Sequence, residues 1–305
     1  MRGRLTALSV CLTLVACSNS ESSPISWPVT LPPVALRPPA NLDQGVVTTA
    51  NNSNVAASVP STSALGETTT TSSTSTSTTT TTTLPPVPIS LAFTGDILVQ
   101  RGLWPTASKN AQTSGSTEPY DFSPMFNDVS EILSSADLAV CHLESPIAPQ
   151  GAEPFSYPKY QVPPQIIRAI ADAGYDACST ASEHVFDGGS EAINATVNAL
   201  EEQGILQSGM ARTPGEIKPL PTQVGEVVIA HMAYTLRYDS APVVGEEWRS
   251  ALIDIPRILA DAREARSLGA QAVVLSLHWG NEDSAVPTEQ QRQWANELTV
   301  SGEID

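Results

Sequence analysis

Hydrophobic residues are distributed unevenly along this 305-residue chain. An apolar run over residues 5–16, about twelve residues long, follows Met-Arg-Gly-Arg at the N-terminus, and it is too short for a membrane span. Residues 18–87 are then rich in Ser, Thr and Pro, with a nearly pure Thr/Ser tract over 68–83. Regular apolar runs begin only near residue 88, so we expect one folded domain over 88–305.

Short apolar runs recur within this C-terminal region, and they are mostly free of alternation between apolar and polar residues. Continuous runs of this length are typical of strands that are buried on both faces. The expected strands are 89–94, 138–141, 177–180, 227–233 and 272–277.

Helical patterns separate these runs. Ile193, Val197 and Leu200 show the spacing of a helix with one apolar side. Alternation of strands and helices predicts an α/β domain with layered, mostly parallel β-sheets flanked by helices. The expected helices are 124–135, 164–173, 190–203, 250–268 and 289–300.

The N-terminal segments predict export. Residues 1–17 have the pattern of a lipoprotein signal peptide whose last four residues, Leu14–Cys17, resemble a lipobox with lipidation at Cys17. Ordinary secretion, with Cys17 left as a spare thiol, is the alternative. Residues 18–87 contain too little apolar surface to fold, and we expect a disordered linker. The domain would then be tethered as a lipoprotein to the outer face of a bacterial cytoplasmic membrane or to the cell envelope.

Charge and cysteine content narrow the possible partners. The formal net charge of −17 argues against nucleic acid as a partner, because nucleic-acid binding requires a basic surface. Within the expected domain the cysteines are Cys141 and Cys178. Exported proteins often pair such residues, whereas their apolar surroundings suit a buried free thiol, and the sequence leaves both open.

All four histidines of the chain lie at or near the carboxyl end of an expected strand, and they are His142, His184, His231 and His278. In open α/β sheets that edge is where ligands bind. Several carboxylates accompany them: Asp96, Glu144, Glu183, Asp187 and Glu282. A mixture of imidazole and carboxylate ligands suits a divalent metal such as Mn, Fe, Zn or Mg.

These residues stand in motifs that resemble the bacterial CapA family, which is named for capsule and poly-γ-glutamate synthesis. The resemblance extends over essentially all of residues 89–305 and includes the segments 207–213 and 287–291. The motifs that carry it are Gly95–Leu98, His142–Pro146, Ala181–His184 with Asp187–Gly189, and Ser276–Gly280.

The resemblance implies a fold similar to calcineurin-like metallophosphoesterases and a metal centre. The implied metal ligands are Asp96, Glu144, His184 and His278. We expect His184, Glu183 and Asp187 to act in catalysis, with Asp187 and Glu282 orienting ligands or shuttling protons. Secondary candidates are His142 and His231, each of which could merely cap its strand, and Arg212, which could meet an anionic substrate group or simply be solvated.

Two departures from the family pattern bear on these expectations. The family usually has Asn where this chain has Glu183, and a carboxylate cannot donate a hydrogen bond to a phosphate oxygen. Family members also continue, after a segment like 300–305, into a strand and a Gly-His-His motif. The resemblance therefore implies that the domain is truncated at its C-terminus.

Two functions remain open at this point. One is a cell-surface, metal-dependent hydrolase of capsule or poly-γ-glutamate-type polymer biosynthesis. The other is a non-catalytic accessory lipoprotein that binds or exports the polymer. In either case the expected partners are an acidic envelope polymer or its synthesis machinery, and the membrane through a lipid anchor. A solute-binding lipoprotein would leave the clustered histidines unexplained.

Overall fold

The computed structural model describes residues 88–305. The expectations for the signal peptide, for Cys17 and for the linker lie outside these residues. No helix within 88–305 is long and apolar enough to cross a membrane.

The first sheet contains four parallel strands in the order β1-β2-β3-β4. Every residue of β2 is buried, as its continuous apolar run predicts for a central strand. The strands are β1 (Leu91–Ile97), β2 (Leu138–Leu143), β3 (Ala177–Ser179) and β4 (Leu206–Ser208).

The second sheet contains three strands in the order β5-β6-β7. They are β5 (Pro221–Val224), β6 (Val227–Thr235) and β7 (Ala272–His278). β5 and β6 are antiparallel, whereas β6 and β7 are parallel. The ends of β6 and β7 therefore lie at the same edge, where Thr235 is the register partner of His278.

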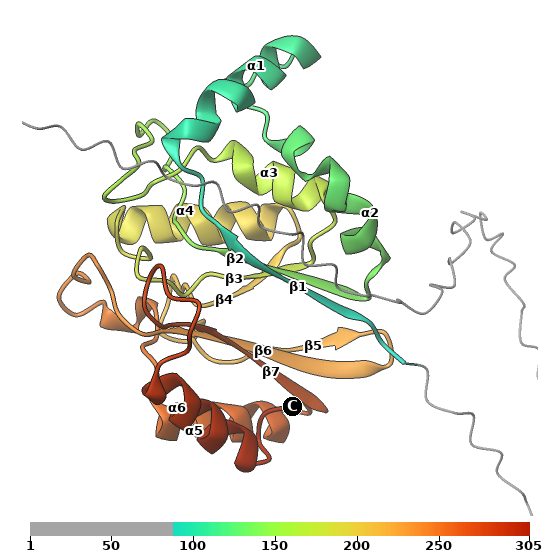
Figure 1. Cartoon of the computed structure of the whole chain (residues 1–305), viewed down its shortest axis with the longest axis vertical. Coiled ribbons are helices and arrows are strands. Elements are labelled where there is room, and N and C mark those ends of the chain that lie inside the picture. Colours follow the sequence, from blue (N-terminus) through green and yellow to red (C-terminus); the bar gives the residue numbers. More distant parts are fainter. Residues whose placement is uncertain (1–87) are drawn as a thin grey trace, which may run out of the picture. The chain divides into compact units, whose positions relative to one another are not determined.

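The two sheets lie between two layers of helices (Figure 1). The helices α2 (Asn127–Ser135), α3 (Gln165–Asp172) and α4 (Gly189–Glu202) cover the outer face of the first sheet. The helices α5 (Ile255–Ser267) and α6 (Glu289–Val300) cover the outer face of the second. This arrangement confirms the expected α/β class with layered, mostly parallel sheets.

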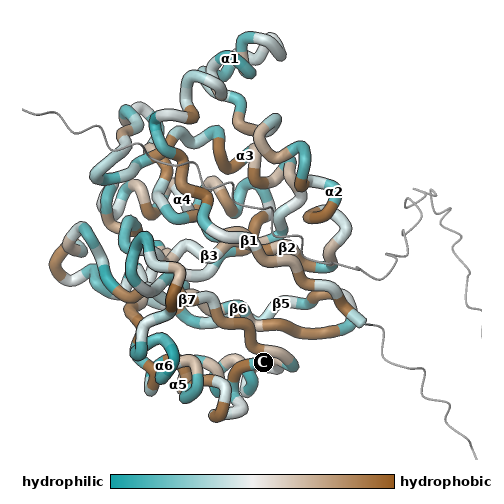
Figure 2. The backbone as a smooth tube through the Cα atoms, viewed as in Figure 1, coloured by the Kyte–Doolittle hydropathy of each residue, from teal (hydrophilic) through white to brown (hydrophobic). Residues whose placement is uncertain are grey.

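Apolar cores between the layers hold the described residues together. Ile166, Ile170 and Leu200 are fully buried in the core between the first sheet and its helices. Val140 and Ile229 lie in the smaller core that contains residues of both sheets, and Ile258 lies in the core beneath α5 and α6. Figure 2 shows the corresponding concentration of apolar residues along the strands.

Most expected elements are found within a few residues of their predicted bounds. The expected helix 289–300 coincides with α6, whose first turn is capped by Thr288 and Gln291. The expected helix 250–268 begins later, at Ile255, because the side chain of Asp254 accepts a hydrogen bond from the backbone N–H of Arg257 and caps the helix there.

Several elements were not expected. The sequences of β4 and β5 are short, and the helix α1 (Trp104–Ser114) is mostly polar, so none shows a clear periodic pattern. The described residues also contain short 3-10 helices at Arg101–Leu103, Ser123–Phe126 and Glu247–Arg249.

A disulfide joins Cys141 of β2 to Cys178 of β3, at positions that are direct register partners. Both residues belong to the core between the first sheet and its helices. The sequence left open either a disulfide or buried free thiols at these positions, and the structure contains the disulfide.

Candidate metal centre

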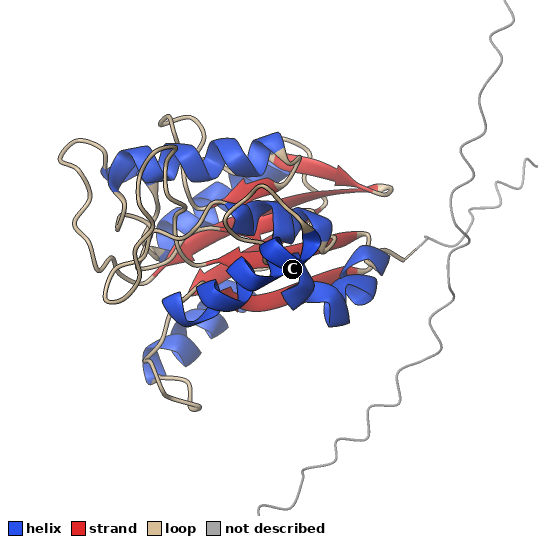
Figure 3. Cartoon of the chain, turned by 90° about the horizontal axis from the view of Figure 1, so that it is seen from above, coloured by secondary structure: helices blue, strands red, loops and turns tan. Residues whose placement is uncertain are grey.

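The carboxyl ends of β1, β2 and β7, together with the loops that follow β2, β3, β6 and β7, carry the candidate residues of the cleft. Figure 3 shows that long loops gather at one end of the strands. Asp96 lies near the end of β1, immediately after a register irregularity between Phe93 and Asp96. Such irregularities redirect side chains at a sheet edge. In the new register Asp96 is the partner of His142 in β2.

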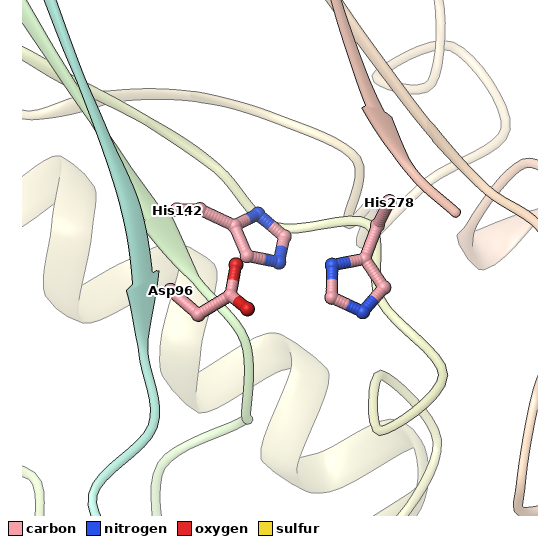
Figure 4. Close-up of side chains that lie close together, drawn as sticks. All are labelled: Asp96, His142 and His278. Atoms are coloured by element: carbon pink, nitrogen blue, oxygen red, sulfur yellow. The ribbon is translucent and has the colours of Figure 1, made fainter. Parts of the chain in front are cut away.

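Asp96, His142 and His278 form one group whose potential ligand atoms all lie within 4.8 Å of one another. They come from β1, β2 and β7, and thus from both sheets. Figure 4 shows the three side chains pointing toward one another.

The ring of His142 is held in an orientation suited to a ligand. Its Nδ1 atom lies 2.7 Å from the hydroxyl oxygen of Ser179, and that hydroxyl donates to the carbonyl oxygen of Cys141. Ser179 thus accepts a hydrogen bond from Nδ1, which leaves a lone pair on Nε2. This Nε2 atom is buried and has no hydrogen-bonding partner. The ring also stacks on His278, with centroids 4.7 Å apart.

Glu144, Glu183 and His278 form a second group within the same 4.8 Å limit. His278 Nε2 lies 2.5 Å from Glu183 Oε2, yet this buried oxygen has no hydrogen bond of acceptable geometry. We therefore regard the pair as a close contact rather than an aligned hydrogen bond. The two atoms are thus in direct contact, and both residues belong to the second group of potential ligands.

A cleft of about 700 Å³ is lined by members of both groups, whereas His142 lines a neighbouring cavity of about 310 Å³ that also contacts Asp96 and His278. The cleft is lined by all four residues that the resemblance implied as metal ligands, namely Asp96, Glu144, His184 and His278. It is also lined by Glu183 and Glu282. The residues expected to form one centre are therefore brought to one cavity at the ends of the strands.

His184 is positioned by a chain of hydrogen bonds. Its Nδ1 atom lies 2.8 Å from Asp187 Oδ2, and the same oxygen accepts from the backbone N–H of Tyr160. The other carboxylate oxygen of Asp187 accepts from the hydroxyl of Ser240 at 2.5 Å. His184 is in neither three-residue group, and its ring contacts the ring of Tyr160 edge to face.

The electrostatics of the site reflect burial and crowded charge. Burial and the nearby carboxylate of Asp96 raise the pKa of Glu144 to about 7. Burial and the neighbouring His278 lower the pKa of His142 to about 3. Burial would raise the pKa of Glu183, but its contact with His278 outweighs burial and lowers this pKa to about 2.

Two secondary candidates lie elsewhere. His231 of β6 lines a separate cavity of about 390 Å³, and its Nε2 lies 2.9 Å from the hydroxyl of Ser276. Arg212 lines the same separate cavity and is paired with Glu201 and Glu216. The structure therefore does not bring either residue to the cleft.

Arg237 is a cleft residue that sequence reasoning missed. It follows β6, lines the cleft and pairs with Glu183, Glu282 and Asp239. A single Arg in a loop offers no sequence signal, because an exposed, solvated Arg is the ordinary case.

The residues present fit a divalent cation. Buried polar atoms normally have partners, and His142 Nε2 and Glu183 Oε2 lack hydrogen bonds while each belongs to a group of potential ligands. Imidazole nitrogens mixed with carboxylate oxygens suit Mn, Fe, Zn or Mg rather than a metal that prefers sulfur ligands. A cation would be held by Asp96, His142 and His278, or by Glu144, Glu183 and His278.

Comparison with known families places these motifs in context. The family described as "Bacterial capsule synthesis protein PGA_cap" matches residues 90–305. The "Capsule biosynthesis protein CapA" of Bacillus anthracis is 20% identical over 223 residues, which cover 70% of this chain and 52% of that protein. The "PGA biosynthesis protein CapA" of Bacillus subtilis is 22% identical over 218 residues, which cover 70% of this chain and 55% of that protein. The chain thus spans about half the length of these relatives.

Among solved structures, the 5'-nucleotidase precursor from Thermus thermophilus matches with a TM-score of 0.31 and 12% identity. The match covers 63% of this chain and 37% of that one. At this score the likeness adds nothing to the description of the site.

Proposed function

This chain belongs to the PGA_cap family of bacterial capsule synthesis proteins, and on that premise we propose that residues 88–305 form a metal-dependent hydrolase domain. Its substrate would be an acidic envelope polymer of the poly-γ-glutamate type. The observation that carries the proposal is the convergence of two ligand groups that share His278, with Asp96 and His142 in one and Glu144 and Glu183 in the other.

The bound cation would supply Lewis-acid chemistry, polarising the oxygen of an amide or ester and activating water. Glu144, Glu183 and His278, which line the cleft, would hold it as one group, and Asp96, His142 and His278 form the other group that would do so. Ser179 orients His142 through Nδ1, so that Nε2 faces the ligand group.

His184 is suited to a role in proton transfer at its other ring nitrogen. Asp187 occupies Nδ1, and Asp187 is itself fixed by Ser240 and by the backbone of Tyr160. The ring therefore has one orientation, and Nε2 is left for a water molecule, a leaving group or a second cation. Glu282 lies at the rim, where its link to Arg237 makes it a positioning residue.

The setting of the domain belongs to the same proposal. Attachment through Cys17 and an extended linker would hold the domain at the outer face of the membrane, close to a growing envelope polymer. The relatives are named for capsule and PGA biosynthesis, which supports an envelope role.

Glu183 supports a second candidate, an accessory protein that binds the polymer without cleaving it. A carboxylate at this position cannot donate a hydrogen bond to a substrate oxygen. In that case the ligand groups would hold a structural cation or bridge a cation to the polymer's carboxylates.

One experiment separates the two candidates. The full-length chain is incubated with a γ-linked glutamate oligomer and Mn²⁺, and released products are followed by mass spectrometry. The hydrolase proposal predicts cleavage that a chelator abolishes and that His278→Gln removes, whereas His231→Gln, outside the cleft, retains it. Binding of the oligomer without cleavage would instead support the accessory protein.

A further inference from the structure

We infer that Arg237 binds the anionic group of the substrate, a carboxylate or phosphate, within the metal cleft. This inference rests on the proposed function and adds a recognition residue to it. The cleft is lined by five carboxylates and, among the described residues that line it, by one Arg or Lys side chain. The carboxylates are Asp96, Glu144, Glu183, Asp239 and Glu282.

An anionic substrate would meet strong repulsion in such a cleft. Like charges at close range are unfavourable, and the effect increases as water is excluded. A cation held by Glu144, Glu183 and His278 would offset part of that charge, but it would not orient a second anionic group along the cleft. Arg237 is the side chain placed to do so.

The guanidinium of Arg237 is only partly engaged by the protein. Its Nε donates to Asp239 at 3.2 Å, and its Nη2 donates to Glu282 at 2.9 Å and to Glu183 at 3.3 Å. Within residues 88–305 no group accepts a hydrogen bond from Nη1. The side chain is 43% exposed, so this edge can be reached from solvent.

The backbone around Arg237 is tied to the metal centre on both sides. The N–H of Leu236 donates to the carbonyl oxygen of His278 at 2.9 Å. The N–H of Asp239 donates to the carbonyl oxygen of Glu183 at 2.9 Å. The loop that carries Arg237 is therefore anchored beside two candidate ligands, so a substrate group bound to the guanidinium would lie close to the proposed cation.

The two chemistries that fit are a carboxylate and a phosphate. The planar guanidinium donates two parallel hydrogen bonds to either group. The hydrogen bond from Arg237 to Glu183 is the longest of the three that Arg237 donates. A cation bound to Glu183 would weaken this hydrogen bond further.

Arg212 provides a matched comparison. It also interacts with several acceptors, but both Nη atoms are used: Nη1 contacts Glu201 and Asn198, and Nη2 contacts Glu216. It lies outside the cleft. Replacing it removes an equal charge from the protein without touching the proposed subsite.

The test uses the full-length chain loaded with Mn²⁺ and two probes, a γ-linked glutamate pentamer and inorganic phosphate, each titrated by calorimetry. We expect Arg237→Gln to weaken binding of one or both probes by about 10-fold to 100-fold, the usual effect of losing a charge-assisted hydrogen bond. Arg212→Gln should bind both probes as the unaltered protein does. The probe that loses affinity identifies the substrate group.

Equal affinities in Arg237→Gln and Arg212→Gln would overturn the inference, as would failure of both probes to bind the unaltered protein at millimolar concentration. Manganese content, measured on the same samples, reports on the proposed function separately. A protein that binds no Mn²⁺ but still binds a probe through Arg237 would refute the metal site and retain the anion site.

Discussion

The first sheet places candidate ligands at the ends of three strands, whereas the second sheet contributes His278 and Arg237 from two. All strands of the first sheet are parallel, so their carboxyl ends collect Asp96, His142, Glu144 and the loop that contains Glu183. In the second sheet β5 runs in the opposite direction and ends at the other edge. Strand direction thus decides how many candidate residues each sheet contributes to the cleft.

The sheets differ as well in how they are held. The first sheet has a covalent link between β2 and β3, directly beside the His142–Ser179 pair, whereas within the described residues the second sheet relies on hydrogen bonds and packing. On this account the disulfide makes the first sheet the more rigid of the two. The first sheet supports most of the candidate ligands, and the second sheet completes the site with His278.

The largest expected effect concerns this link. Replacing Cys141 and Cys178 together by Ala should lower the free energy of unfolding by roughly 4 kcal/mol, because the closed loop spans 37 residues. Urea denaturation of the oxidised protein and the variant measures the difference. Reducing agent should destabilise the unaltered protein and leave the variant unchanged; an unaltered protein that is indifferent to reduction would show that the link does not stabilise the sheet.

The second prediction concerns His231 of β6, in the second sheet. Burial lowers its pKa to about 4, below the unfolded value of 6.5, so folding favours the neutral ring. This preference contributes roughly 3 kcal/mol to the free energy of unfolding. The contribution is fully present above pH 6.5 and is lost as the pH falls toward 4. Arg212, Glu216 and Lys218 line the same cavity and carry the nearby charges.

Unfolding free energies of the unaltered protein and of His231→Gln, measured from pH 7.5 to 4, test this assignment. The difference between the two curves should change by that amount. His142, whose pKa is lowered mainly by burial and by His278 and only to a smaller extent by His231, contributes to both proteins, so most of its contribution cancels. Parallel curves would mean that His231 does not titrate as a buried group.

The third prediction concerns Asp187, whose carboxylate fixes the orientation of the His184 ring. Asp187→Asn keeps the side-chain shape but weakens the hydrogen bond to His184 Nδ1. His184 is the candidate for proton transfer and lies outside both ligand groups, so hydrolysis should slow by about 100-fold while metal affinity stays nearly unchanged. Product release followed by mass spectrometry measures the rate, and competition with a fluorescent chelator measures the affinity; a large loss of metal affinity would instead place His184 among the ligands of the metal.

The smallest effect is expected at Arg212, outside the cleft. Arg212→Gln removes partly exposed ion pairs to Glu201 and Glu216, and it should cost about 1 kcal/mol or less. Thermal unfolding in low and high salt measures this cost, which should shrink as salt increases. A much larger loss would show that the loop of Arg212 is part of the folded core.

Much of the architecture follows from local sequence patterns. The run 138–141 is continuous and apolar because β2 is buried on both faces, and the capped start of α6 is encoded by Thr288 and Gln291. The short strand β5 was not predicted, because its four residues, Pro221–Val224, carry one fully buried side chain and no continuous apolar run.

The candidate site was predictable as a region but not in its pairings. The position of the motifs at strand ends, together with the family resemblance, predicted Asp96, Glu144, His184 and His278 as metal ligands. All four line one cleft. The contact of Glu183 with His278 joins residues of opposite sheets, and the orientation of His142 depends on Ser179 of the neighbouring strand. Such contacts arise from packing between layers, which no local pattern encodes.

The most direct test of the central claim is the metal content of the purified full-length chain, measured by mass spectrometry after dialysis against a defined mixture of Mn²⁺, Zn²⁺ and Mg²⁺. The account predicts at least one tightly held cation per chain, lost in His278→Gln, which removes a ligand from both groups, and retained in His231→Gln. A chain without metal, or equal metal in the two variants, would contradict a centre built on His278.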